Sequence, residues 1–226
     1  MAALKEALRL GAEIQSPLSD VLTSLFGAWI NFQRGDRQAA KAHARSVISA
    51  CEQYSFAGWA ITAQIIDCAM DEQAPSPERI AELAHSTKAA TAWRQSFGLA
   101  TLAELCAANG RADLARDMLD RIASGERSAM LAPEIERIEG QLCLAHSQPA
   151  SDEAERRFRL SIEIAREREQ KSYELRTTVC LARLLDSRGR RDEARATLGG
   201  IYEWFTEGFD TVDLRTAKAL LGSLWA

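Results

Sequence analysis

A glycine placed between two alanines at fixed distances recurs three times in this chain of 226 residues. The glycines are Gly35, Gly110 and Gly189, and in each case one alanine stands seven residues before and another five residues after. Glycine ends a helix in the left-handed conformation at little cost. Alanines on both sides let two antiparallel helices approach closely at their crossing. The pattern therefore predicts a helical hairpin around each glycine.

The spacing of these glycines predicts two further hairpins. They are 75 and 79 residues apart, so one additional hairpin fits in each interval, with a period near 38. That period is slightly above the ~34 residues of a tetratricopeptide repeat. Ser76 before Pro77 is typical of a helix start, as is Ser151 or Asp152. We see no alternation of polar and apolar residues that would indicate a strand.

We therefore predict an all-α fold in a single domain over residues 1–226: a right-handed superhelical solenoid of the tetratricopeptide type. A short leading helix near 2–12 is followed by about five hairpins and a capping helix. The expected hairpins lie near 17–54, 57–91, 93–124, 130–169 and 171–206, and the capping helix over 211–224.

The charge and hydropathy of the chain limit the classes of partner that it can bind. The net charge of −4 provides no basic field for phosphate contacts, so we expect no nucleic-acid partner. No apolar stretch approaches the ~20 residues that span a bilayer, and the N-terminus carries no signal-peptide pattern. We expect a cytoplasmic protein without membrane contact.

Catalytic and metal-binding patterns are absent from the sequence. His43, His85 and His146 fall in three different hairpins, and none has a second ligand-type residue three or four residues after it. The five cysteines form no CxxC pair, and most are spaced by about one hairpin, which favours small apolar fillers inside helices. We expect no metal, no cofactor and no enzymatic activity.

Several segments resemble the C-terminal tetratricopeptide region of large bacterial signalling proteins. In those proteins an adenylate/guanylate cyclase or transcription-regulator domain precedes a predicted ATPase domain and then the helical array. The segments are 89–94, 134–140, 171–176, 181–184, 189–194, 202–211, 213–214 and 217–221. The chain departs from the family in having no phosphate-binding GxxxxGK[ST] loop and no cyclase segment. It is either a stand-alone array or a C-terminal piece of a longer protein.

In tetratricopeptide arrays the first helix of each hairpin lines a concave groove, and this assigns candidate binding residues. They are Trp29, Phe32, Glu134, Arg137, Gln141, Arg176 and Arg183. Arginines bind carboxylates in a bidentate way, so the three arginines could clamp an acidic peptide or domain edge. Alternatively, Glu134 and the arginines only tie adjacent hairpins together, which we favour. Likewise, Trp29 and Phe32 could anchor a partner, but packing between hairpins is the interpretation we favour.

The function expected from these observations is a non-catalytic protein-interaction or regulatory scaffold of a bacterial signalling system. Its partner would be a protein, a peptide or an upstream ATPase or cyclase domain held in the groove. The alternative is a small-ligand sensor domain that regulates an attached or partner cyclase or ATPase. The end faces of the array could also pair into a homodimer.

Overall fold

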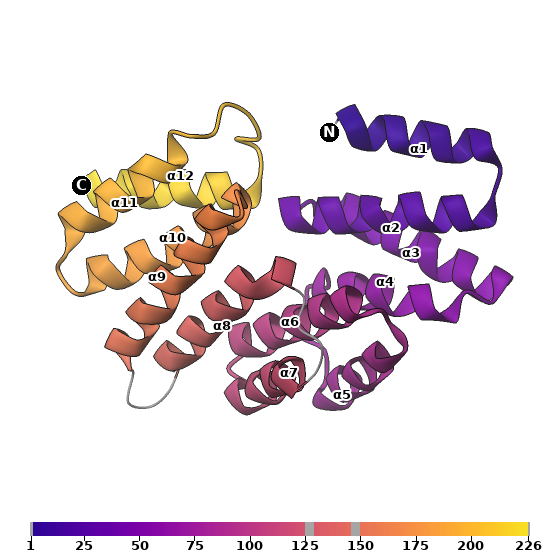
Figure 1. Ribbon diagram of the computed structural model, residues 1–226, viewed down its shortest axis with the longest axis horizontal. Coiled ribbons are helices and arrows are strands. Elements are labelled where there is room, and N and C mark those ends of the chain that lie inside the picture. Colours follow the sequence, from indigo (N-terminus) through magenta and orange to yellow (C-terminus); the bar gives the residue numbers. More distant parts are fainter. Residues whose placement is uncertain (1, 125–128, 146–149, 226) are drawn as a thin grey trace. The chain divides into compact units, whose positions relative to one another are not determined.

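The computed structural model describes residues 2–124, 129–145 and 150–225 (Figure 1). Over these residues the chain forms twelve α-helices, two short 3-10 helices and no β-strand, which confirms the all-helical prediction. The chain divides into two compact units, Met1–Leu105 and Cys106–Ala226. The single domain expected from the sequence is thus subdivided, at a point within one helix. None of the described helices is both long and apolar enough to cross a membrane.

The first unit is a run of antiparallel helices. They are α1 (Ala2–Ile14), α2 (Pro17–Arg34), α3 (Arg37–Tyr54), α4 (Ala57–Ala69), α5 (Pro77–Ser86), the 3-10 helix η1 (Thr87–Ala89) and most of α6 (Ala92–Ala108). Helix α2 packs against α1, α3 and α4, and α4 packs against α5. Fully buried side chains such as Val21, Val47 and Ile66 fill the space between these helices. Helices α2 and α3 occupy the first expected hairpin.

Besides the end of α6, the described part of the second unit contains six α-helices and one 3-10 helix. They are α7 (Ala112–Ser124), the 3-10 helix η2 (Ala129–Leu131), α8 (Ala132–Ala145), α9 (Ser151–Glu167), α10 (Lys171–Ser187), α11 (Arg191–Tyr202) and α12 (Val212–Trp225). Helix α10 packs against α8, α9, α11 and α12. One apolar core, centred on Phe158, Leu175 and Leu185, runs through α9 to α12. Helix α12 adds Leu214 and Leu224 to that core, as expected of a capping helix.

The three motif glycines end helices in the way the sequence predicts. Gly35, Gly110 and Gly189 have φ angles of 74°, 70° and 74°, in the left-handed region that favours glycine. The six flanking alanines are fully buried: Ala28, Ala40, Ala103, Ala115, Ala182 and Ala194. Both parts of the repeat pattern therefore have the physical roles assigned to them.

Gly140 marks the closest helix crossing of the fourth hairpin. A methyl group added to Gly140 would lie 2.5 Å from Cε1 of Phe158, a ring that is fully buried. Helices α8 and α9 can therefore meet at this distance only because position 140 has no side chain. Gly140 is not one of the candidate binding residues. Its lack of a side chain lets the ring of Phe158 pack between α8 and α9.

Candidate functional site

Five of the seven candidate binding residues lie on two neighbouring helices of the second unit. Glu134, Arg137 and Gln141 project from α8, whereas Arg176 and Arg183 project from α10. Helix α10 also packs against α12, so α8, α10 and α12 are successive neighbours. A binding surface was expected on these helices. Their candidate residues divide into a mostly buried cluster and the exposed Arg183.

The first group is a buried ion-pair cluster, here called the Glu134 cluster: Glu134, Arg137, Gln141, Arg176 and Asp213. Arg137 is 1% exposed and Glu134 is 6% exposed. The Nη2 atom of Arg137 donates to Oε1 of Glu134, and its Nη1 atom donates to Oε1 of Gln141 at 2.9 Å. Nη1 of Arg176 donates to the same Glu134 oxygen at 3.3 Å. Because Nη2 of Arg176 also binds Oδ2 of Asp213 at 2.8 Å, the cluster joins α8, α10 and α12.

The charge state of Glu134 is set by its two arginines. Burial alone would raise the pKa of this carboxyl group, because a charge is poorly solvated inside a protein. The positive charges of Arg137 and Arg176, and the hydrogen bonds from both, outweigh burial and lower the pKa of Glu134 to about 2. Glu134 is therefore ionised at neutral pH and compensates two guanidinium groups at once.

A second buried carboxylate ties α9 to α10. Glu174 is 3% exposed, and its Oε1 accepts a hydrogen bond from Nε of Arg166 at 2.6 Å. Its Oε2 accepts one from Nζ of Lys171 at 2.8 Å. The pair Glu174–Arg166 links consecutive helices, whereas Glu174–Lys171 lies within the first turn of α10. These contacts hold neighbouring hairpins together, as does the Glu134 cluster.

Arg183 differs from the other two arginines of the expected clamp. It is exposed, and it forms no hydrogen bond or ion pair with any residue that the structure describes. Arg137 and Arg176, in contrast, are held by carboxylates of their own chain. The structure thus does not bring the three arginines together as a clamp. Of these three arginines, only Arg183 presents its guanidinium group to solvent.

Sequence reasoning missed the residue that completes the Glu134 cluster. Asp213 lies in the first turn of α12. In the structure it is the partner of Arg176, 37 residues away in sequence. Only the packing of α12 on α10 reveals this pair, because acidic residues are common in first helical turns.

The two aromatic candidates lie in the first unit and contact other rings there. Trp29 packs near Trp93 and Phe97, with ring centroids 6.4 Å apart in both cases. Phe32 meets Phe97 edge to face at 5.9 Å. Trp29 and Phe32 are half-buried. These contacts join α2 to α6 and match the packing interpretation of the two residues.

A pocket in the first unit was not anticipated. Its volume is about 610 Å³, and it lies between α3, α4 and the loop that leads to α5. Carboxylates dominate its charged lining, with Asp67, Asp71 and Glu72 beside one arginine, Arg79. Lys41 of α3 donates a hydrogen bond to Asp71 at the rim. The sequence over 71–77, which contains two prolines, indicates a loop there but no pocket.

The histidines show no arrangement for metal binding. His43 is half-buried next to Gly27, and His85 is exposed on α5. His146 lies outside the described residues. Within the described ranges no group of three or more histidine, cysteine, aspartate or glutamate side chains could hold a metal ion.

The comparisons with known proteins add no family. No protein-family model matches the chain, and a search of curated proteins finds no match. The resemblance to the helical arrays of bacterial cyclase- and ATPase-linked proteins therefore stays a prediction from the residues quoted above.

Proposed function

We propose that the chain is a non-catalytic scaffold in which tetratricopeptide-like hairpins form a right-handed solenoid that holds a protein partner. The observation that carries the proposal is the contrast on α10 between Arg176, bound by its own chain, and Arg183, exposed without a partner among the described residues. A free arginine beside a rigid polar cluster is suited to bind a carboxylate of a partner, because its planar fork matches carboxylate geometry.

Apart from Gln141, the residues of the Glu134 cluster support this proposal as a framework and not as the contact itself. They fix α8 relative to α10 and α10 relative to α12 through side chains that are mostly buried. A preformed surface loses less conformational entropy on binding, which raises affinity. On this account Arg183, together with Gln141 on the adjoining helix, contacts the partner, and Arg137 and Arg176 position the helices.

The partner that fits is an acidic peptide or the acidic edge of a protein domain. An upstream or separately encoded ATPase or cyclase domain of a bacterial signalling system agrees with the family resemblance. The same surface in a cytoplasmic protein would serve docking or regulation. Pairing of two copies through their end faces is compatible with this function, and light scattering would detect it.

The test is equilibrium binding of a library of acidic peptides to the wild-type chain and to two variants. In Arg183→Gln the proposed contact is lost, whereas Arg215→Gln removes an equally exposed arginine on α12 that also has no partner among the described residues. We expect Arg183→Gln to weaken binding by roughly 5- to 30-fold, equivalent to about 1–2 kcal/mol for a charged hydrogen bond.

Two results would overturn the proposal. The first is that no acidic peptide shows binding that weakens as salt is added. Such weakening is expected because ions screen the contact between Arg183 and a carboxylate. The second is that Arg183→Gln and Arg215→Gln bind a peptide equally well. An unchanged melting temperature in both variants shows that any loss of binding does not arise from unfolding.

The pocket of the first unit favours a second candidate, a small-ligand sensor. A volume of about 610 Å³ falls within the range of small-molecule sites. The lining carboxylates Asp67, Asp71 and Glu72 already pair with Lys41, Arg45 and Arg37, so a cationic ligand would have to replace these side chains. A thermal-shift screen of small cationic metabolites distinguishes the two functions, because a ligand that binds only the folded chain raises its melting temperature. Asp67→Asn would abolish that shift.

A further inference from the structure

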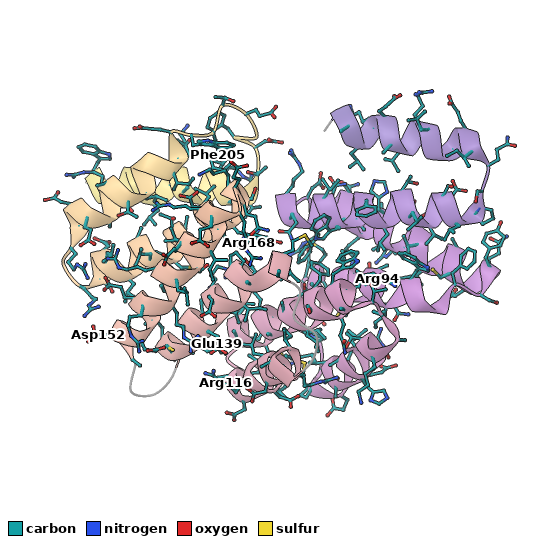
Figure 2. The ribbon with its side chains drawn as sticks, in the orientation of Figure 1. Arg94, Arg116, Glu139, Asp152, Arg168 and Phe205 are labelled. Carbon is teal, nitrogen blue, oxygen red and sulfur yellow. The ribbon has the colours of Figure 1, made fainter. Side chains whose placement is uncertain are left out.

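Arg94 lies in the first turn of α6 (Figure 2). It is 5% exposed and forms no ion pair with any carboxylate among the described residues. Its Nη1 atom donates to the backbone carbonyl of Gly58 in α4, and its Nε atom donates to Oγ1 of Thr91 at 3.2 Å. The flat face of the guanidinium group lies 4.1 Å from the centre of the Trp59 ring. Hydrogen bonds and a cation–π contact thus position the group firmly.

No negative charge compensates Arg94. The segments that surround it, 53–66 and 83–103, contain no aspartate or glutamate. Among the described residues Arg94 forms no ion pair, and its Nη2 atom makes no hydrogen bond. Burial lowers the pKa of Arg94 from its ordinary value, because the charged form is poorly solvated there. A buried guanidinium without a counter-ion is unfavourable, since buried charges are normally paired.

The carbonyl that binds Arg94 belongs to the first turn of a helix. Gly58 is the second residue of the 13-residue helix α4. The residue before α4, Phe56, has no side chain that caps the helix, although its carbonyl accepts a hydrogen bond from the N–H of Trp59 at 2.9 Å. The first N–H groups of a helix carry a partial positive charge. Lys88 in η1, which packs against α4, is exposed and has no partner among the described residues.

We propose that Arg94 and the N-terminus of α4 form a binding site for an oxyanion, either a carboxylate or a phosphate. The anion would accept hydrogen bonds from Nη2 of Arg94 and would compensate both the buried guanidinium and the helix end. Trp59 on the other side of the guanidinium keeps it in place. This site is in the first unit and does not depend on the proposed role of Arg183, which belongs to the second.

Trp59 makes the site observable, because its ring is in contact with the proposed ligand-binding group. The experiment is a titration of tryptophan fluorescence with sodium phosphate, sodium acetate and sodium chloride at constant ionic strength. The wild-type chain is compared with Arg94→Gln, Trp59→Phe and the control Arg215→Gln, at an exposed arginine of α12. Circular dichroism verifies that each variant is folded. The oxyanion that saturates at the lower concentration identifies the preferred ligand chemistry.

We expect a saturable change in the wild type and in Arg215→Gln with phosphate or acetate but not with chloride. In Arg94→Gln the half-saturating concentration should rise at least roughly tenfold, as expected when a charged hydrogen bond is lost. In Trp59→Phe the fluorescence change should disappear. If Arg94→Gln does not fold, the loss of signal in Trp59→Phe supports the site and its persistence overturns it. The site is also overturned if the wild type shows no saturable change, if chloride acts equally, or if folded Arg94→Gln binds as tightly.

Discussion

Replacing Glu134 by glutamine removes the buried carboxylate that pairs with Arg137 in α8. Arg137 is 1% exposed, so its guanidinium group would remain buried after losing this partner. Breaking a buried ion pair by removing one partner costs about 3–5 kcal/mol, because the other charge stays uncompensated. Arg176 would lose the same acceptor but keep Asp213, so the damage centres on Arg137.

The matched control is Glu136→Gln on the same helix. Glu136 pairs with Arg157 at 2.7 Å, and 37% of the Arg157 side chain is exposed. A pair that water screens contributes under about 1 kcal/mol. The free energy of unfolding is measured by urea denaturation followed by circular dichroism, and hydrogen exchange of the α8 and α10 amides locates the loss. We expect Glu134→Gln to be several times more destabilising than Glu136→Gln.

A second substitution tests the physical reason. In the double variant Glu134→Gln, Arg137→Met the buried charge is removed together with its partner, and much of the lost stability should return. The reasoning is refuted if Glu134→Gln costs no more than Glu136→Gln, or if adding Arg137→Met lowers stability further.

The lowered pKa of Glu134 gives the same prediction as a function of pH. Its folded-state pKa of about 2 lies below the ordinary value of 4.5. The stability it contributes is therefore fully present above pH 4.5 and is lost as the pH falls from 4.5 towards 2. The difference in unfolding free energy between wild type and Glu134→Gln should shrink across that window. A difference that stays constant down to pH 2 would contradict the assignment.

Three further substitutions separate the local causes of the fold, all measured as changes in unfolding free energy. Gly140→Ala should cost about 1–3 kcal/mol, because the added methyl group overlaps the buried ring of Phe158; a stabilised variant would show that the ring moves freely. Gly189→Ala meets no atom within 4 Å, so only its left-handed backbone resists, at about 1–2 kcal/mol. Asp36→Ala removes the oxygen that accepts from the N–H of Ala39 at 3.0 Å and should cost about 1 kcal/mol; no loss would mean that water replaces the cap.

Much of the helical order could be predicted because its signals are local. Gly35 and Gly189 end helices through their own backbone conformation, and Ser76 caps α5 by accepting a hydrogen bond from the N–H of Arg79. These effects act over three or four residues, so the sequence order alone reveals them.

The candidate site was less predictable because its contacts join distant residues. Arg137, Arg176 and Arg183 were all placed on the groove face of their repeats, yet two are bound by carboxylates and one is exposed. The difference depends on Asp213, which reaches Arg176 only when α12 packs on α10. Repeat position therefore indicates which face a side chain lies on, but not whether its charge is already compensated.

Aromatic residues show the same limit in the first unit. Trp29 and Phe32 were placed on a groove face, where an anchor for a partner and an internal contact look alike in sequence. Phe97, more than 60 residues further on, supplies the ring that both contact. Trp59 likewise gained its role from Arg94, a residue of another helix.

The central claim is that the second unit holds an acidic partner at Arg183. The most direct measurement is hydrogen exchange of the chain with and without the tightest-binding acidic peptide from the library. The account predicts slower exchange in α10 near Arg183 and in the adjoining part of α8 near Gln141, with both effects absent in Arg183→Gln. Slower exchange confined to other helices, or the same pattern in Arg183→Gln, would contradict it.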